Sequence, residues 1–180
     1  MGFLGRWLSD AIRLGLALSL TLAAMQVPAI AQGYATALLQ IAQESRRDIE
    51  HRKAVARQFY AIPAEDDEGV IAALRRVEPA NAESLGNSIR RAAGLRAAYD
   101  RIEAASPLLR PVVALADAMD DEVDKHAILR TALAEHVPQV SLSLAGGVYG
   151  LAGLLLGTLL AQMVIAPFAG RAAARRAAWR

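Results

Sequence analysis

The chain has no cysteine, which excludes disulfide bonds and thiol chemistry and leaves the redox compartment open. Aromatic residues make up only 5% of its 180 residues although 54% are hydrophobic, so alanine, leucine and valine supply most apolar groups. Lysine is also scarce, with 2 lysines against 18 arginines. No alternating strand pattern of useful length occurs, and the sequence therefore predicts an all-α protein.

Charge is absent from one long stretch, because residues 137–170 hold no charged side chain over 34 positions. A helix of about 20 apolar residues crosses a bilayer core, so we expect a transmembrane helix over 138–168. Four glycines recur within it at spacings of four, three and four, which places them on one side of a helix. Such a bare surface lets a second helix approach closely in lipid. We call it the glycine face: Gly146, Gly150, Gly153 and Gly157.

An earlier uncharged stretch, from Leu14 to Ile41, predicts a first transmembrane helix over 14–32. Ala29-Ile30-Ala31 also resembles the cleavage site of a signal peptide, but the stretch is longer than a usual signal and favours a retained span. Its small residues could pack on the glycine face, and the alternative is a glycine face that joins copies of the chain. These small residues are Gly15, Ala17, Ser19, Ala23 and Ala24.

Positive charge is concentrated at the two ends. Residues 44–135 carry 17 acidic and 14 basic side chains, so the basic balance does not indicate a nucleic-acid surface. Basic flanks beside apolar runs predict cytoplasmic segments at 1–13 and 169–180, with an extracytoplasmic domain at 33–137. The arginines expected to set this topology are Arg6, Arg13, Arg171, Arg175, Arg176 and Arg180.

The domain between the spans reads as helical hairpins. Prolines and small polar residues separate segments in which apolar residues recur at helical spacing. Asn81 is a candidate N-cap, and Ser106-Pro107 is a candidate helix start. Because the chain lacks cysteine, one introduced near Val70 is a topology probe.

Catalytic and metal-binding patterns are weak. His51 and His136 read as surface or interfacial residues, whereas His126 follows five carboxylates within ten positions. Zinc needs more nitrogen or sulfur ligands, and a calcium loop needs a central glycine that this segment lacks. We therefore expect no metal, cofactor or catalytic residue. The carboxylates are Asp117, Asp120, Asp121, Glu122 and Asp124.

Five short motifs stand out along the chain: Gln26-x-Pro28-x-x-x-Gln32-x-Tyr34, Leu109-Arg110-Pro111, Met119-Asp120-Asp121-Glu122, His136-Val137-Pro138 and Pro167-Phe168. Together they resemble a bacterial family described as domain of unknown function 2937. The resemblance covers most of the chain and implies an inner-membrane protein with two spans, but no activity. One departure is Ser141, where similar proteins carry a second proline after Pro138.

Two functional hypotheses follow. The first is a non-enzymatic accessory subunit of the inner membrane, which binds another membrane or envelope protein, or a second copy of itself, through its helical domain and glycine face. The second is a membrane-tethered metal-binding or catalytic domain centred on His126. A further possibility is a secreted protein with a C-terminal anchor, if the chain is cleaved after Ala31.

Overall fold

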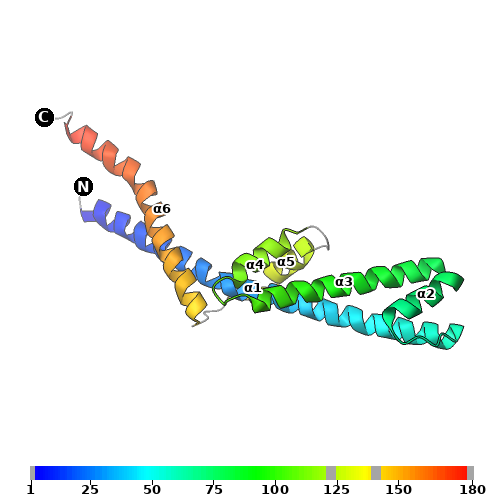
Figure 1. Cartoon of the computed structure of the whole chain (residues 1–180). Coiled ribbons are helices and arrows are strands. Elements are labelled where there is room, and N and C mark those ends of the chain that lie inside the picture. The colour runs from blue at the N-terminus through cyan, green and yellow to red at the C-terminus, as the bar shows by residue number, and fades with distance from the viewer. Residues whose placement is uncertain (1–2, 121–124, 139–142, 178–180) are drawn as a thin grey trace. The chain divides into compact units, whose positions relative to one another are not determined.

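The computed structural model describes residues 3–120, 125–138 and 143–177, with side chains placed from residue 7 to residue 166 within those ranges. These ranges contain six helices and no strand, which confirms the all-α prediction (Figure 1). The helices are α1 (Phe3–Tyr60), α2 (Asp67–Val77), α3 (Pro79–Ala104), α4 (Arg110–Ala118), α5 (Lys125–Ala134) and α6 (Leu144–Ala177).

The chain divides into two compact units. Unit 1 comprises Met1–Ile30 and Val137–Arg180, and unit 2 comprises Ala31–His136. Helix α1 is 58 residues long and belongs to both units, since it continues through Pro28 without ending.

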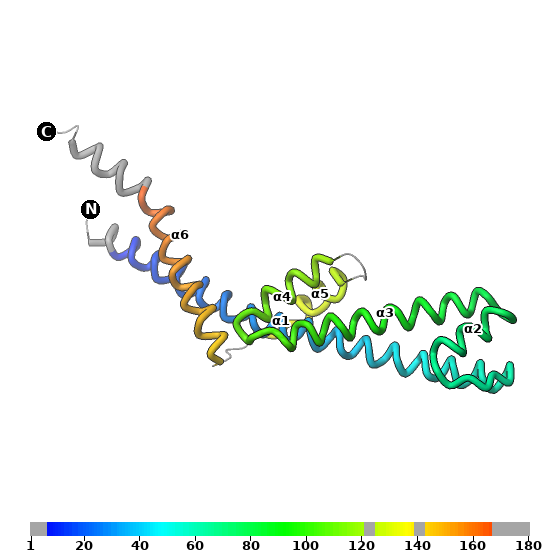
Figure 2. The backbone as a smooth tube through the Cα atoms, viewed as in Figure 1, coloured from blue at the N-terminus to red at the C-terminus, as the bar shows by residue number. Residues whose placement is uncertain are grey.

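Unit 2 is built on an antiparallel pair formed by α1 and α3, which lie side by side in Figure 2. One apolar cluster joins Leu38 of α1 to Ile102 of α3, together with residues of α4 and α5. The other joins Ile49 of α1 to Leu85 of α3 and to Leu74 of α2. Alanines fill most remaining core positions, so the helices approach closely with little aromatic packing.

The starts of the short helices follow local chemistry. Asp66 is the N-cap of α2, because its carboxylate accepts a hydrogen bond from the Gly69 amide at 3.0 Å. The prediction of Asn81 as an N-cap is wrong: α3 begins at Pro79, and the Asn81 side chain bonds Glu78 and Arg52 instead. Helix α4 likewise begins at Arg110 and not at Pro107, because Pro111 occupies its first turn.

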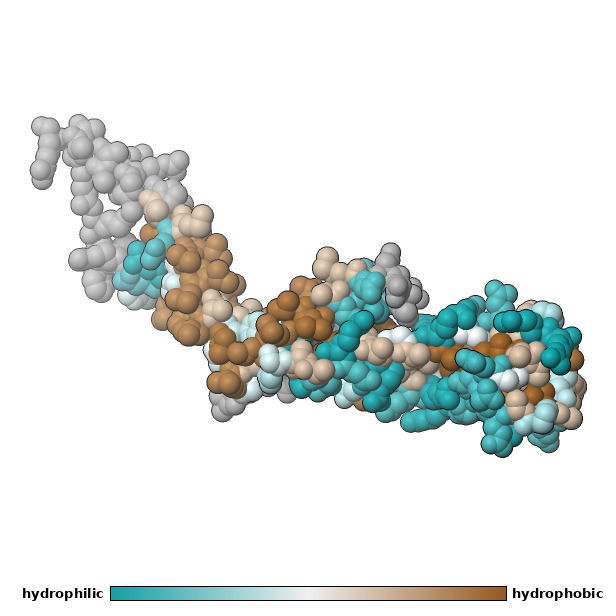
Figure 3. All heavy atoms as spheres, in the orientation of Figure 1, coloured by the Kyte–Doolittle hydropathy of each residue, from teal (hydrophilic) through white to brown (hydrophobic). Residues whose placement is uncertain are grey.

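The two apolar segments expected to cross a membrane lie mainly in unit 1. Two helices are long and apolar enough to do so, over Trp7–Tyr60 and Leu144–Ala166. At the start of α6, the Ser143 hydroxyl accepts a hydrogen bond from the Gly146 amide at 3.0 Å. In Figure 3 hydrophobic residues gather over α6 and over α4, whereas hydrophilic residues dominate around α2.

Candidate functional site

The glycine face of α6 packs against the first part of α1 within unit 1. All four of its glycines are buried, and Ala161 extends the buried line by one turn. A Cβ atom at Gly157 would lie 2.7 Å from the Ala17 Cα, and one at Gly153 would overlap the Leu20 carbonyl oxygen. Backbone meets backbone at these two positions, so the contact requires the absence of side chains.

The partner surface on α1 uses only some of the expected small residues. Ala17 and Ala24 contact the glycine face, while Leu20 contributes its main chain between them. Gly15, Ser19 and Ala23 are exposed. The spacing explains the difference, because residues 17, 20 and 24 share one side of a helix and residues 15, 19 and 23 share another.

The surface of α6 away from the glycine face is leucine-rich and exposed. Leu151, Leu155 and Leu159 expose more than half of their surface, at 59%, 59% and 57%. A helix with small buried residues on one side and exposed leucines elsewhere is typical of packing in lipid, where leucine faces the acyl chains.

Among the six topology arginines, the structure describes the side chain of Arg13. Its guanidinium lies 3.8 Å from the Asp10 carboxylate, and both side chains are exposed. The side chains of the other five lie outside the described residues: Arg6, Arg171, Arg175, Arg176 and Arg180. Their role in orientation stays a prediction.

A buried aspartate connects four helices of unit 2. Asp117 on α4 accepts hydrogen bonds from the Tyr34 hydroxyl on α1 at 2.9 Å and from Arg101 on α3 at 2.6 Å. Lys125 on α5 donates to the same carboxylate at 3.1 Å and to Asp120 at 3.4 Å. The side chains of Asp117 and Lys125 are only 3% and 4% exposed.

Burial would raise the pKa of Asp117, but the hydrogen bonds from Lys125, Tyr34 and Arg101 outweigh it and hold that pKa below its usual value. The pKa of Tyr34 is raised, because burial and the Asp117 carboxylate both disfavour a phenolate. The cluster is thus an ionised carboxylate whose two oxygens are both occupied. This arrangement fixes helices in place and offers no evident base or nucleophile.

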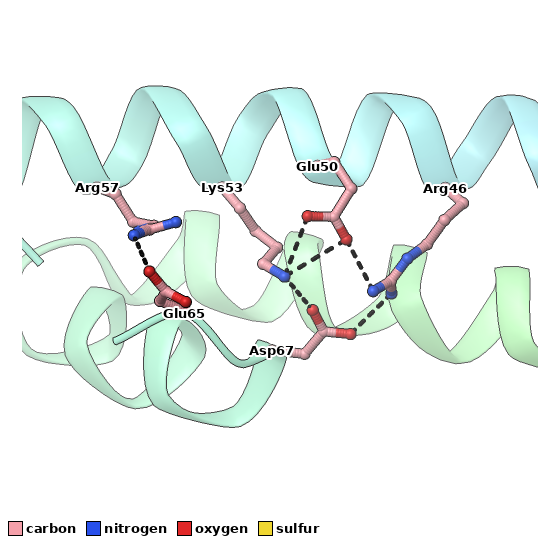
Figure 4. Close-up of polar contacts among 6 residues, drawn as sticks. All are labelled: Arg46, Glu50, Lys53, Arg57, Glu65 and Asp67. Carbon is pink, nitrogen blue, oxygen red and sulfur yellow. Dashed lines mark hydrogen bonds and ion pairs between the residues drawn. The ribbon is translucent and has the colours of Figure 1, made fainter. Parts of the chain in front are cut away.

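A second ion cluster fixes the start of α2 against α1 (Figure 4). Lys53 donates to Asp67 at 2.5 Å and lies 3.3 Å from Glu50, while Arg46 reaches the other Asp67 oxygen at 2.8 Å. Hydrogen bonds from Lys53 and Arg46 lower the pKa of Asp67. Nearby, Arg57 pairs with Glu65 at 3.3 Å.

The two lysines of the chain therefore occupy equivalent roles that sequence reasoning missed. The side chains of Lys53 and Lys125 are 7% and 4% exposed, and each pairs with an aspartate of another helix. The sequence held one sign of these buried pairs. The chain has only two lysines, and a lysine is seldom buried in a protein without a charged partner. Likewise, Asp117 is the single charge within the apolar run 111–119.

The structure does not gather His126 and its neighbours into a metal site within the residues it describes. His126 is exposed, and Asp117 and Asp120 are bound by Lys125. Across the described ranges, no group of three His, Asp or Glu side chains lies close enough to hold an ion. Asp121, Glu122 and Asp124 lie outside those ranges.

Comparison with known proteins gives one match. A family model described as "Protein of unknown function (DUF2937)" matches residues 8–174, which include all of unit 2 and most of unit 1. No curated protein and no solved structure matches the chain.

Proposed function

The chain belongs to the DUF2937 family of proteins of unknown function, and from that premise we propose a non-enzymatic membrane subunit with two transmembrane helices. In this proposal α6 and the first part of α1 cross the inner membrane of a bacterium. Unit 2 stands outside the cytoplasm and binds another membrane or envelope protein.

The observation that carries the membrane assignment is the division of α6 into a tightly packed glycine face and an exposed leucine surface. In water, such a leucine surface would be an aggregation site. In lipid it is the normal exterior of a span, and the glycine face supplies the van der Waals contact that holds two helices together there.

Because α1 of the same chain covers the glycine face, the proposal assigns partner binding to unit 2. A groove of about 370 Å³ lies where the end of α1 meets the start of α3. Val55 and Phe59, which is 78% exposed, line it from α1, and Glu78 and Asn81 line it from the start of α3. An exposed aromatic beside polar groups is typical of a protein-binding surface.

The orientation follows from the terminal arginines and is tested with single cysteines. Val70 is fully buried, so the exposed Ala97 is the better probe position in unit 2. We expect an impermeant thiol reagent to label Ala97→Cys in intact spheroplasts, and to label Trp179→Cys only after permeabilisation. The reverse pattern would refute the orientation, and release of the chain by carbonate would refute the membrane assignment.

Partner binding is tested by copurification from native membranes after crosslinking. We expect the Phe59→Ser variant to lose a crosslinked protein that the unaltered chain retains. Leu133→Ser is the matched control, because Leu133 is an exposed leucine outside the groove. Retention of every crosslinked protein by Phe59→Ser would contradict the assignment of this groove.

A further inference from the structure

Helix α4 has the opposite polarity to a helix of a water-soluble domain. Its buried side carries the charged Asp117, while its exposed side is apolar. Val112, Leu115 and Met119 are 58%, 56% and 69% exposed. Leu109 and Ala116 are exposed beside them, and all five positions fall within about a third of the helix circumference.

The two charged residues of α4, Arg110 and Asp117, are turned away from this face. Arg110 is half-buried and donates to the Glu103 and Ala105 carbonyl oxygens, at 3.0 and 3.3 Å, and its guanidinium also pairs with the Glu103 carboxylate at 2.9 Å. Asp117 points into unit 2, where Tyr34 and Lys125 hold it. The exposed side of α4 therefore carries no charged side chain of its own. The nearest charged side chains are Arg101, 60% exposed and bound to Asp117, and Asp120, 46% exposed and bound to Lys125.

The contact with Tyr34 fixes α4 to a particular level of α1. Tyr34 donates to Asp117, and Ala31, Tyr34 and Ala35 share an apolar cluster with Ala114 and Ala118 of α4. The first span is expected to end at residue 32, so Tyr34 lies about 3 Å further along the helix axis. The headgroup layer extends about 5–7 Å beyond each side of the hydrocarbon core. In the proposed membrane arrangement, Tyr34 therefore falls within this layer.

We propose that the exposed apolar face of α4 lies in the headgroup layer of the bilayer, so that α4 is an interfacial helix and the lipid surface is its partner. This inference rests on the proposed membrane function. Lipid fits this face better than a second protein does, because the residues that anchor α4 follow the first span directly and because the face has no charge. An interfacial helix inserts such an apolar side among headgroups and acyl chains.

Spin labels on single cysteines test the proposal in the full chain, reconstituted in vesicles of phosphatidylcholine and phosphatidylglycerol. Val112→Cys probes the α4 face. Val77→Cys is the matched control, because Val77 is an equally exposed valine, at 57% against 58%, at the end of α2. Leu155→Cys reports on the span itself. Each label is measured for collision with dissolved oxygen, which concentrates in lipid, and with a water-soluble nickel chelate.

We expect the label at 112 to collide with oxygen several times more often than the label at 77, and with the chelate several times less often. Equal behaviour at the two positions would overturn the proposal, as would dipolar broadening that shows a second copy over α4. If the label at 155 reports lipid in that case, the membrane assignment survives and only the interfacial helix fails. If the label at 155 reports water, the proposed function fails as well.

Discussion

Gly153 of α6 lies directly against the main chain of Leu20 on α1, so closely that a Cβ atom at position 153 would overlap the Leu20 carbonyl oxygen. Because the obstructing atom belongs to the backbone of a helix, it cannot move aside as a flexible side chain could. The two helices of unit 1 depend on glycine at this position.

The first prediction compares two glycines of the same helix. Gly153→Ala should weaken the pairing of α1 and α6 by about 1–3 kcal/mol, the usual cost of overpacking. Gly147→Ala should be neutral or slightly stabilising, because nothing lies within 4 Å of its Cβ position and alanine favours a helix. Thermal unfolding in detergent measures both. Equal stability of the two variants would count against the packing described here.

The second prediction ranks positions along the glycine face. At Gly150 a new Cβ meets Met25 side-chain atoms at 2.9 and 3.3 Å, whereas at Gly157 it meets Ala17 main-chain atoms. Met25 can change rotamer, so Gly150→Ala should cost less stability than Gly157→Ala. Gly150→Leu and Gly153→Leu are both too large and should loosen the helix pair. Thermal unfolding in detergent ranks the stabilities of Gly150→Ala and Gly157→Ala. A Gly150→Ala variant less stable than Gly157→Ala would contradict this prediction.

The third prediction concerns the buried aspartate. Asp117→Ala leaves the Lys125 ammonium buried without its main partner and should destabilise unit 2 by about 3–5 kcal/mol. Asp100→Ala removes an exposed pair with Arg96, in which both side chains are 55% exposed, and should cost less than about 1 kcal/mol. Denaturant titration of both variants measures the difference. A similar small loss in both would show that the buried cluster contributes little.

The fourth prediction gives the pH dependence of that cluster. The pKa of Asp117 is lower in the folded chain than the value of about 3.9 expected after unfolding. Its contribution is therefore fully present above about pH 4 and is lost as the pH falls through the folded pKa. The free energy of unfolding of the unaltered chain should exceed that of Asp117→Asn at neutral pH, and this difference should become smaller below about pH 4. A difference in unfolding free energy that stays constant from neutral pH into acid would contradict a lowered pKa for Asp117.

The fifth prediction separates two ion pairs of α1, one with Asp67 at the start of α2 and one with Glu65 in the segment before it. Asp67→Ala should destabilise unit 2 by about 1–3 kcal/mol, because it removes a hydrogen-bonded partner of the buried Lys53. Glu65→Ala serves as the control. Glu65 is 85% exposed, so the loss of its pair with Arg57 should change the stability of unit 2 very little. Thermal unfolding followed by circular dichroism compares them.

Much of the helical framework was readable from the sequence because it depends on local chemistry. The uncharged stretch with four spaced glycines predicted an apolar helix with one side free of side chains. Local patterns failed at Asn81 and Ser106. Both residues are good caps, but Pro79 and Pro111, which suit a first helical turn, set the starts of α3 and α4 instead.

The sequence by itself determined that this protein is all-α, has two helices apolar enough to span a bilayer and carries its positive charge at the ends, since these properties depend on composition and short-range periodicity. Only the tertiary structure decided which residues meet. It brought Ala17, rather than Gly15, to the glycine face, and it brought Lys125 and Tyr34 to Asp117 across 8 and 83 positions of sequence. Long-range pairing depends on how whole helices pack, and no local pattern encodes that packing.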